Sequence, residues 1–446
     1  MKSKMRIKKF FSKNKICDYM FNLCYQCVIS FFFFIFICNN SFSQTSHTKI
    51  VESWDKLLLV DDREKNFRLP SFLDDLSKNV FLDEENALSG WVYEKAPDYD
   101  YNIAAGVLTF SNQNSLLIWL ISLNEEKTSC VFSKELDSWG LAITNLTINF
   151  DSNQTFSIRI NDNKYVDVPD IQIKILFSKL KYDKPDTEKE KISLDIWERL
   201  QKLLEDKLLF DNGFSDYEQL ATVISDDKKV KICTWNIENK SGEHFFYGGL
   251  VINTSSKPIV YELKDEKKSI KNHRETVLTP DKWYGCIYYD IIENQYKGNT
   301  YYTLIGFNGN NAFTQIKLID ILTFSEKDNS TPKFGISMFT NQYKNNRRLI
   351  FEYGKNTTMM LRYDANVKMI VMDNLSPSEP YYKNDFRFYG PDFSHNGLKF
   401  DKGEWIFMDD IDLRNSKSFS NEDLQEKVRK REINKTRKRE SLRFND

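Results

Sequence analysis

The sequence has few of the residues that build compact metal, nucleophile or phosphate sites. Its 446 residues include four histidines, which lie far from one another and from the cysteines. A zinc site made of neighbouring ligands needs His and Cys at short spacing. The chain also lacks the patterns GxxxxGKS/T, GxSxG, HExxH and the EF-hand loop. We therefore expect no metal site, no cofactor and none of the enzyme classes that depend on these motifs.

Cysteine, glycine and proline are scarce as well. Four of the seven cysteines lie in the first 43 residues, and the other three, Cys130, Cys233 and Cys286, are widely spaced. Three cysteines allow at most one disulfide, whose pairing the sequence leaves open, and their apolar surroundings predict buried thiols. The chain has only 16 Gly and 10 Pro, which excludes a collagen-like or linker-dominated protein. Its 34 Phe and 22 Tyr favour strands.

What the sequence does have is an N-terminal pattern typical of export. Seven basic residues lead into an apolar or small run of 12 residues at 27–38, and Ser41-Phe42-Ser43 follows. This order predicts a secretory signal peptide over residues 1–43, cleaved between Ser43 and Gln44. The run is shorter than the about 20 residues that span a bilayer, so an uncleaved membrane anchor is the less favoured alternative. We expect a periplasmic or extracellular protein that is not integral to the membrane after cleavage.

Loss of the signal peptide would change the charge balance. Residues 1–43 carry seven basic residues and one acid, so the net charge would go from −1 to −7. A net acidic mature chain lacks the positively charged surface that binds the phosphate backbone, which argues against nucleic acid as a partner. The partner is otherwise left open, with an envelope component or a glycan as the candidates. Residues 415–446 are dense in Lys, Arg and Glu and predict a charged tail, helical or disordered.

Hydrophobic periodicity changes twice along the exported part. Residues 44–183 contain short apolar or alternating runs, among them IQIKILF at 171–177, and predict a strand-rich N-terminal domain with a hairpin about Asp151–Gln154. Residues 184–227 have apolar residues at helical spacing and predict a helical connector, including a second short helix over Tyr217–Ile224.

Residues 228–414 return to strand spacing and predict an antiparallel β domain. Ten short runs, from VKICTWNI to EWIFM, alternate with turn signals at Asn308-Gly309, Asn396-Gly397 and Lys402-Gly403. The predicted fold is therefore mainly β with a helical connector, in antiparallel sandwich or meander-like sheets. No fixed period of 40 to 50 residues is present, so an irregular β-propeller is the alternative.

One stretch combines groups that could carry chemistry. Tyr389–Gly397 brings together a proline, a carboxylate, an imidazole and aromatic rings, with further acids behind it. Asp392, with Asp401 or Glu404, provides the candidate acid and base of a hydrolase, and Tyr389 and Trp405 are candidates to stack on a sugar ring. The favoured alternative is structural, with a turn at Pro391, His395 on a hairpin tip and the acids in water.

A second stretch, WYGCIYYDII at 283–292, supplies the remaining candidate ligand contacts. Strand alternation places Trp283 and Tyr289 on one side and Tyr284 and Tyr288 on the other. Rings on both sides predict a two-sided core, with an aromatic ligand-binding surface as the less favoured alternative.

The sequence over about residues 226–415 resembles an uncharacterised family of exported proteins from Bacteroidota. The resemblance rests on six segments: WYGCIYYDII, TYYTLIGFNGNN, PKFGISMF, RRLIFEYG, IVMDNLSPSEP and YGPDFSHNGLKFDKGEWIFMDDIDLRN. The resemblance implies an envelope location and brings no activity with it. We expect a noncatalytic envelope protein that binds or scaffolds. The alternative is a secreted hydrolase of glycans or peptides that uses carboxylates of residues 392–412.

Overall fold

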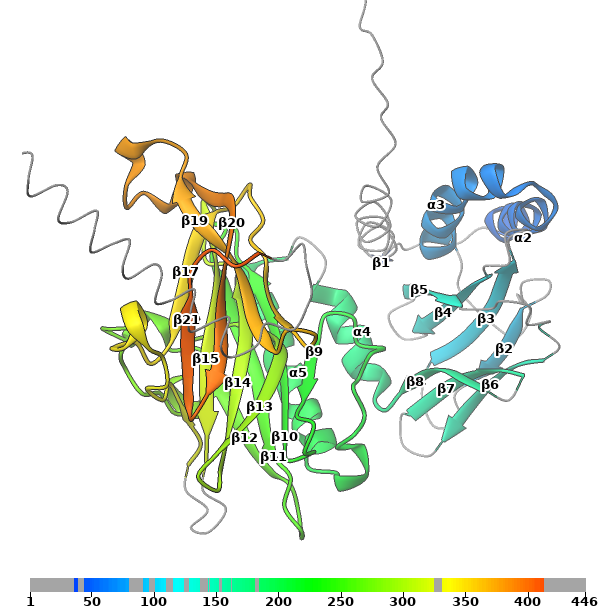
Figure 1. The fold of residues 1–446 in the computed structure, drawn as a ribbon. Helices are drawn as coiled ribbons and strands as arrows, with labels where there is room; N and C mark the ends of the chain where they lie inside the picture. Colours follow the sequence, from blue (N-terminus) through cyan, green and yellow to red (C-terminus); the bar gives the residue numbers. More distant parts are fainter. Residues whose placement is uncertain are drawn as a thin grey trace, which may run out of the picture. The chain divides into compact units, whose positions relative to one another are not determined.

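The computed structural model describes residues 36–38, 44–79, 91–95, 101–109, 115–123, 128–136, 143, 145–151, 155–161, 163–180, 184–324 and 331–412. Most of the signal peptide expected from the sequence, including Ser43 at its end, and the expected charged tail at 415–446 lie outside these ranges. The chain forms two compact units, Met1–Tyr182 and Asp183–Asp446 (Figure 1). Among the described residues 47% are in strands and 23% in helices, which confirms the predicted mainly β class with antiparallel sandwich or meander sheets.

The first unit packs helices against antiparallel sheets. Trp54 and Leu57 of the first helix and Phe72 and Leu76 of the second bury against one face of the larger sheet. The helices are α2 (Gln44–Leu59), α3 (Asp62–Asn79) and α4 (Ile171–Leu180). The larger sheet has the order β1-β5-β4-β3-β2, with β1 (Phe36–Cys38), β2 (Val92–Lys95), β3 (Tyr101–Thr109), β4 (Ser115–Leu123) and β5 (Thr128–Leu136). The smaller sheet contains β6 (Leu146–Asp151), β7 (Thr155–Ile160) and β8 (Asn163–Val168).

Two sequence predictions for this unit have opposite outcomes. The predicted hairpin is present, because β6 and β7 pair up to Asp151 and Thr155. The strand predicted at 171–177 is wrong, because this segment is helix α4. The Asp170 carboxylate accepts two backbone N–H groups of the first turn, at 2.8 and 3.3 Å, and such a cap favours a helix over a strand. Lys174 of α4 lies 4.4 Å from the ring centroid of Phe132 in β5.

The second unit begins with a helix and continues as strands. The helix is α5 (Asp186–Leu204), followed by the 3₁₀ turn η1 (Lys207–Leu209). One sheet has the order β12-β11-β10-β9, formed by β9 (Ala221–Ile224), β10 (Val230–Glu238), β11 (His244–Ile252) and β12 (Ile259–Lys264). The next contains β13 (Ile287–Tyr296), β14 (Asn299–Asn308), β15 (Thr314–Thr323), β16 (Lys333–Phe334) and β17 (Leu349–Gly354). The last has the order β18-β19-β20-β21, formed by β18 (Leu361–Asp364), β19 (Met369–Pro377), β20 (Tyr389–Asp401) and β21 (Glu404–Met408).

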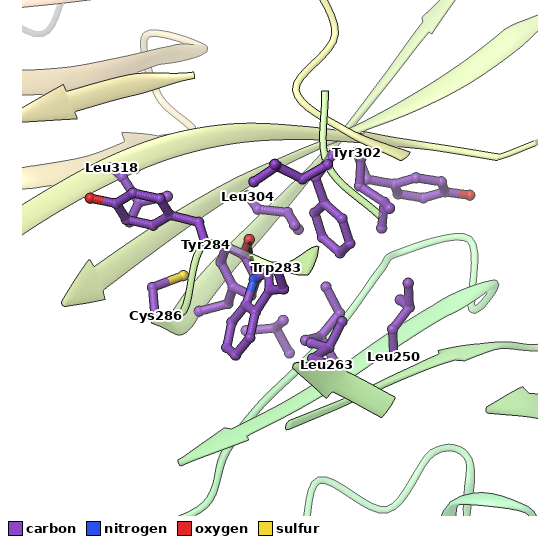
Figure 2. Packing of buried hydrophobic residues seen from close by; sticks show 14 of the residues in the cluster. Leu250, Leu263, Trp283, Tyr284, Cys286, Tyr302, Leu304 and Leu318 are labelled. Carbon is purple, nitrogen blue, oxygen red and sulfur yellow. Dashed lines mark hydrogen bonds between the residues drawn. The ribbon is translucent and has the colours of Figure 1, made fainter. Parts of the chain in front are cut away.

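The β13–β17 sheet is the middle layer of this unit, because both of its faces are buried. Leu304 and Leu318 belong to a core shared with the β9–β12 sheet. Their neighbours Ile305 and Ile319 belong to a second core shared with the β18–β21 sheet. Successive residues of a strand point to opposite faces, so β14 and β15 read as continuous apolar runs. Figure 2 shows the first core, with Trp283 between the leucines of the two sheets.

Three local predictions for this unit are wrong. The second connector helix is absent, since Ala221–Ile224 form β9, which pairs with β10. The turn predicted at Asn396-Gly397 lies inside β20, paired with β19. The segment FRFY at 386–389, one of the ten predicted strand runs, is mostly a 3₁₀ turn. The turn at Lys402-Gly403 is confirmed, with φ values of 49° and 87° between β20 and β21.

Candidate functional site

The loop 378–388, which joins β19 to β20, and the first residues of β20 up to Phe393 form what we call the aromatic projection, residues 378–393 (Figure 1). The pairing of Pro377 with Tyr389 closes the loop at its base, and the N–H of Ser378 donates to the Phe388 carbonyl at 2.9 Å. Two 3₁₀ turns, η5 (Pro380–Tyr382) and η6 (Phe386–Phe388), shape the loop. A proline and two short turns hold the loop 378–388 in a defined conformation although it lies outside the sheet.

Aromatic rings contact one another along the projection. The ring of Tyr382 stacks on that of Phe388, with centroids 3.7 Å apart, and lies 4.1 Å from that of Tyr381, to which it is tilted by 45°. Tyr381 is 75% exposed, so this group of rings reaches water. The carboxylate of Asp385 accepts hydrogen bonds from Arg387 Nε (2.8 Å) and Nη2 (2.6 Å), and these bonds lower the pKa of Asp385. The projection therefore presents rings that are already ordered, with charged groups beside them.

Phe393 is the most exposed large apolar side chain among the described residues, at 95%. Its φ of 67° lies in the left-handed region, which costs a residue with a side chain about 1–2 kcal/mol. The residue sits where the pairing of β19 with β20 is irregular, between Asp373 and Leu375. Neither burial nor backbone preference accounts for a phenylalanine at this position, and such strained residues gather at functional sites.

Hydrogen-bonding groups surround Phe393 on both sides in the sequence. Asp392 accepts from the Ser394 hydroxyl (2.7 Å), the Ser394 N–H (3.1 Å) and Asn374 Nδ2 (2.7 Å). Partial burial alone would raise the pKa of Asp392, but these three hydrogen bonds outweigh it and lower that pKa below its usual value. Asp392 is thus held as a charged acceptor beside an exposed ring.

The strands beneath the irregular pairing fix these groups in place. His395 Nδ1 lies 2.9 Å from Asp373 Oδ1, and the other oxygen of Asp373 accepts the Met360 N–H at 2.7 Å. Asn396 Nδ2 donates to Asn374 Oδ1 at 3.1 Å. His395 therefore lies within a paired strand rather than on a hairpin tip, and Pro391 lies in β20 opposite Leu375 rather than in a turn.

The structure does not bring the three candidate carboxylates together. Asp392 and Asp401 are nine residues apart on β20, on the order of 30 Å at about 3.3 Å per residue. Asp401 and Glu404 are neighbours across the turn between β20 and β21, and both are exposed. Paired glycosidase carboxylates stand about 5–9.5 Å apart, and one of them needs a raised pKa. The described geometry meets neither condition at Asp392.

Two of the four aromatic candidates are core residues. Trp283 is 0% exposed and donates Nε1 to the Tyr288 hydroxyl at 3.1 Å. Trp405 is 1% exposed and donates Nε1 to Thr303 Oγ1 at 3.0 Å. The expected alternation also fails, because Gly285 has a φ of 78° and β13 begins only at Ile287. Burial rules out ligand contact by either tryptophan in this state.

The two candidate tyrosines have different surroundings. Tyr289 is 38% exposed, and its hydroxyl donates to the Leu361 carbonyl at 2.7 Å. Tyr389 is half-buried at the base of the projection, where its hydroxyl accepts the Asn384 N–H at 3.1 Å. Tyr389 therefore stabilises the loop through this hydrogen bond, and its ring is only partly exposed to solvent. Tyr289 is far more exposed than either tryptophan, but it is fixed by its hydrogen bond.

The sequence interpretation missed Tyr381, Phe388 and Phe393. Their signal was an unusual density of rings between residues 381 and 393, interleaved with Asn, Asp, Gly and Pro rather than at strand spacing. Rings in such a segment have no regular face to bury. That argument would have singled out this loop, although it would not have given the exposed fraction of each ring.

Comparison with known proteins gives no relative: no family model, no curated protein and no solved structure matches this chain. Among the described helices, none is long and apolar enough to cross a membrane. Within the same ranges, no three His, Cys, Asp or Glu residues gather closely enough to hold a metal ion. Cys130, Cys233 and Cys286 are buried, and no disulfide joins any two of them.

Proposed function

We propose that this chain is a noncatalytic binding protein of the bacterial envelope, and that the aromatic projection binds a glycan. The observation that carries the proposal is Phe393, a 95% exposed ring on a strained backbone beside a fixed carboxylate. Export through the N-terminal signal and a Bacteroidota source belong to the proposal and come from the sequence alone.

The chemistry of a sugar ring matches this arrangement. A pyranose has a face of C–H groups that packs on an aromatic ring, and hydroxyls at its edge that donate to carboxylates. Phe393 offers the ring, while Asp392 and Ser394 offer an acceptor and a hydroxyl next to it. Burying Phe393 would contribute about 1.5–3 kcal/mol, and ring-specific contacts about 0.5–1.5 kcal/mol more. Rings that are already ordered lose little conformational entropy on binding.

The hydrolase alternative has less support. The pKa of Asp392 is lowered, so the group is ionised at neutral pH and cannot donate a proton to a leaving group. Asp401 and Glu404 lie exposed at a hairpin end, where water is not kept out. A binding role requires neither a paired acid and base nor a closed site.

A titration of the full chain with oligosaccharides released from bacterial envelope polysaccharides tests the proposal. Phe393→Leu keeps an apolar side chain but removes the ring, and we expect it to weaken binding about two- to tenfold. Phe313→Leu is the matched control, because Phe313 is 65% exposed on the loop between β14 and β15. Its affinity should equal that of the parent.

Two results would contradict the proposal. One is a panel of envelope oligosaccharides in which none binds the parent. The other is binding that Phe393→Leu leaves unchanged, since a partner that needs only apolar area, such as a protein surface, would tolerate leucine.

A further inference from the structure

Strand β12 is one edge of the β9–β12 sheet, and part of that edge is unpaired. The N–H of Trp283 donates to the Lys264 carbonyl, and the N–H of Glu266 donates to the Trp283 carbonyl, both at 2.9 Å. The chain at Trp283 therefore covers the edge from Lys264 onward. Because peptide groups alternate along a strand, Val260 and Glu262 direct their N–H and C=O groups to the same side as Lys264. No backbone group in the described ranges pairs with them.

A cavity of about 800 Å³ lies beside this unpaired edge. Four consecutive residues, from Pro258 to Tyr261, line it together with Ile252 and Phe324. Phe324 is stacked on Tyr302, with ring centroids 5.7 Å apart and planes 2° apart. The Tyr302 hydroxyl in turn donates to Asp227 at 2.7 Å, so this wall of the cavity is fixed. A site of this volume is large enough for side chains of an extended peptide.

The end of the cavity next to the β11–β12 turn is basic. Lys207 Nζ donates to the carbonyls of Thr254 and Ser255, at 3.2 and 2.6 Å. Lys257 lines the cavity, and so does Glu205, whose carboxylate pairs with Lys257 at 3.0 Å. Two lysines, Lys207 and Lys257, against one acid, Glu205, leave a positive balance beside this turn among the described residues, which favours a negatively charged ligand group there.

We propose that the free edge of β12 binds an extended segment of a partner polypeptide by strand addition, with a carboxylate of that segment at the lysine end. A strand that joins β12 antiparallel, as all neighbours in this sheet do, runs toward the β11–β12 turn and ends there. Its C-terminal carboxylate, or an acidic side chain near its end, then lies beside Lys257 and Lys207. The stretch between that turn and Trp283 accommodates about five residues, on the order of 17 Å.

The chain at Trp283 explains why the other end of β12 is not part of the site. It occupies the edge from Lys264 onward, and the Lys264 side chain pairs with Glu262 at 3.4 Å, so the free edge ends at Glu262. Val260 and Tyr261 lie against the cavity. The site is independent of the aromatic projection, so its failure and the failure of glycan binding would be separate results.

Peptides displayed with a free C-terminus, selected on the full chain, supply the probe. Selected peptides should slow amide hydrogen exchange at Val260 and Glu262, and N-methylation at alternate peptide positions should weaken binding at least tenfold. Amidation of the C-terminus should weaken binding similarly if the terminal carboxylate is the contact. Retained binding by amidated peptides that end in Asp or Glu would assign the contact to a side chain.

A pair of protein variants gives a second readout. Val260→Pro removes the outward N–H and leaves the hydrogen bonds to β11 in place, whereas Val260→Thr keeps the N–H and is the matched control. Peptide affinity should fall at least tenfold in the first and stay unchanged in the second. A selection without binders would overturn the proposal. So would binders that leave exchange at Val260 and Glu262 unchanged, or a dimer formed through β12 in place of peptide binding.

Discussion

Replacing Phe393 by glycine should stabilise the second unit while it weakens ligand binding. A φ of 67° costs phenylalanine about 1–2 kcal/mol, and glycine adopts this φ without that cost. Glycine loses more backbone entropy on folding, roughly 0.5–1 kcal/mol. The side chain is 95% exposed, so no buried contact is lost. The net expectation is a gain of roughly 0.5–1 kcal/mol in the free energy of unfolding.

Urea unfolding measures this gain as a higher midpoint at an unchanged slope. Phe313→Gly is the control, because Phe313 is also exposed but does not have a positive φ, and it should lose rather than gain stability. A lower midpoint for Phe393→Gly would refute the reasoning, since it would mean that the Phe393 side chain makes stabilising contacts. A stabilised variant with weakened binding would show that the strain is kept for function.

Three further predictions concern buried groups of the second unit. Burial lowers the pKa of Lys231 to about 8 in the folded chain. Between pH 8 and about pH 10 the unfolded chain still holds this proton and the folded chain loses it, so the free energy of unfolding should rise with pH, by at most about 1.4 kcal/mol per pH unit. Lys231→Met should reduce this slope, measured by urea unfolding at each pH. Arg348→Met should lower the free energy of unfolding by about 3–5 kcal/mol, measured in urea, because it leaves the Asp320 carboxylate buried without the Arg348 Nε that lies 2.6 Å from it. Adding Asp320→Leu should restore most of this loss. An Arg348→Met variant as stable as the parent would contradict the prediction. Gly285→Ala should cost about 1–2 kcal/mol or more, because its φ is 78° and a Cβ would lie 2.5 Å from Asp265 Cγ; an unchanged thermal midpoint would contradict it.

Strand periodicity predicted most of the second unit and failed where tertiary contacts decide. The alternating run at 230–237 forms β10 as expected, and Lys402-Gly403 forms the expected turn. Asn396-Gly397 resembles a turn equally well, yet it lies in β20. A Cβ at Gly397 would lie 2.5 Å from Met369 Cε, so this glycine serves close packing. No local pattern distinguishes these two uses of glycine.

The candidate site was predictable in part for a similar reason. Asp392 could be selected from its neighbours in the sequence, and it lies beside the exposed ring of Phe393. Trp283 and Trp405 were candidates for ligand contact, although a structural role was favoured for both stretches, and their rings fill cores between sheets. Which rings are exposed depends on how the layers stack, and the alternation of a single strand does not contain that information.

The most direct test of the central claim is saturation-transfer NMR on the full chain with a bound envelope oligosaccharide. Saturation of the protein's aromatic protons should reach the C–H protons on one face of a single sugar ring most strongly. Phe393→Leu should reduce that transfer, and Phe313→Leu should leave it unchanged. Transfer spread evenly over the oligosaccharide, or unaffected by Phe393→Leu, would contradict glycan binding at the aromatic projection.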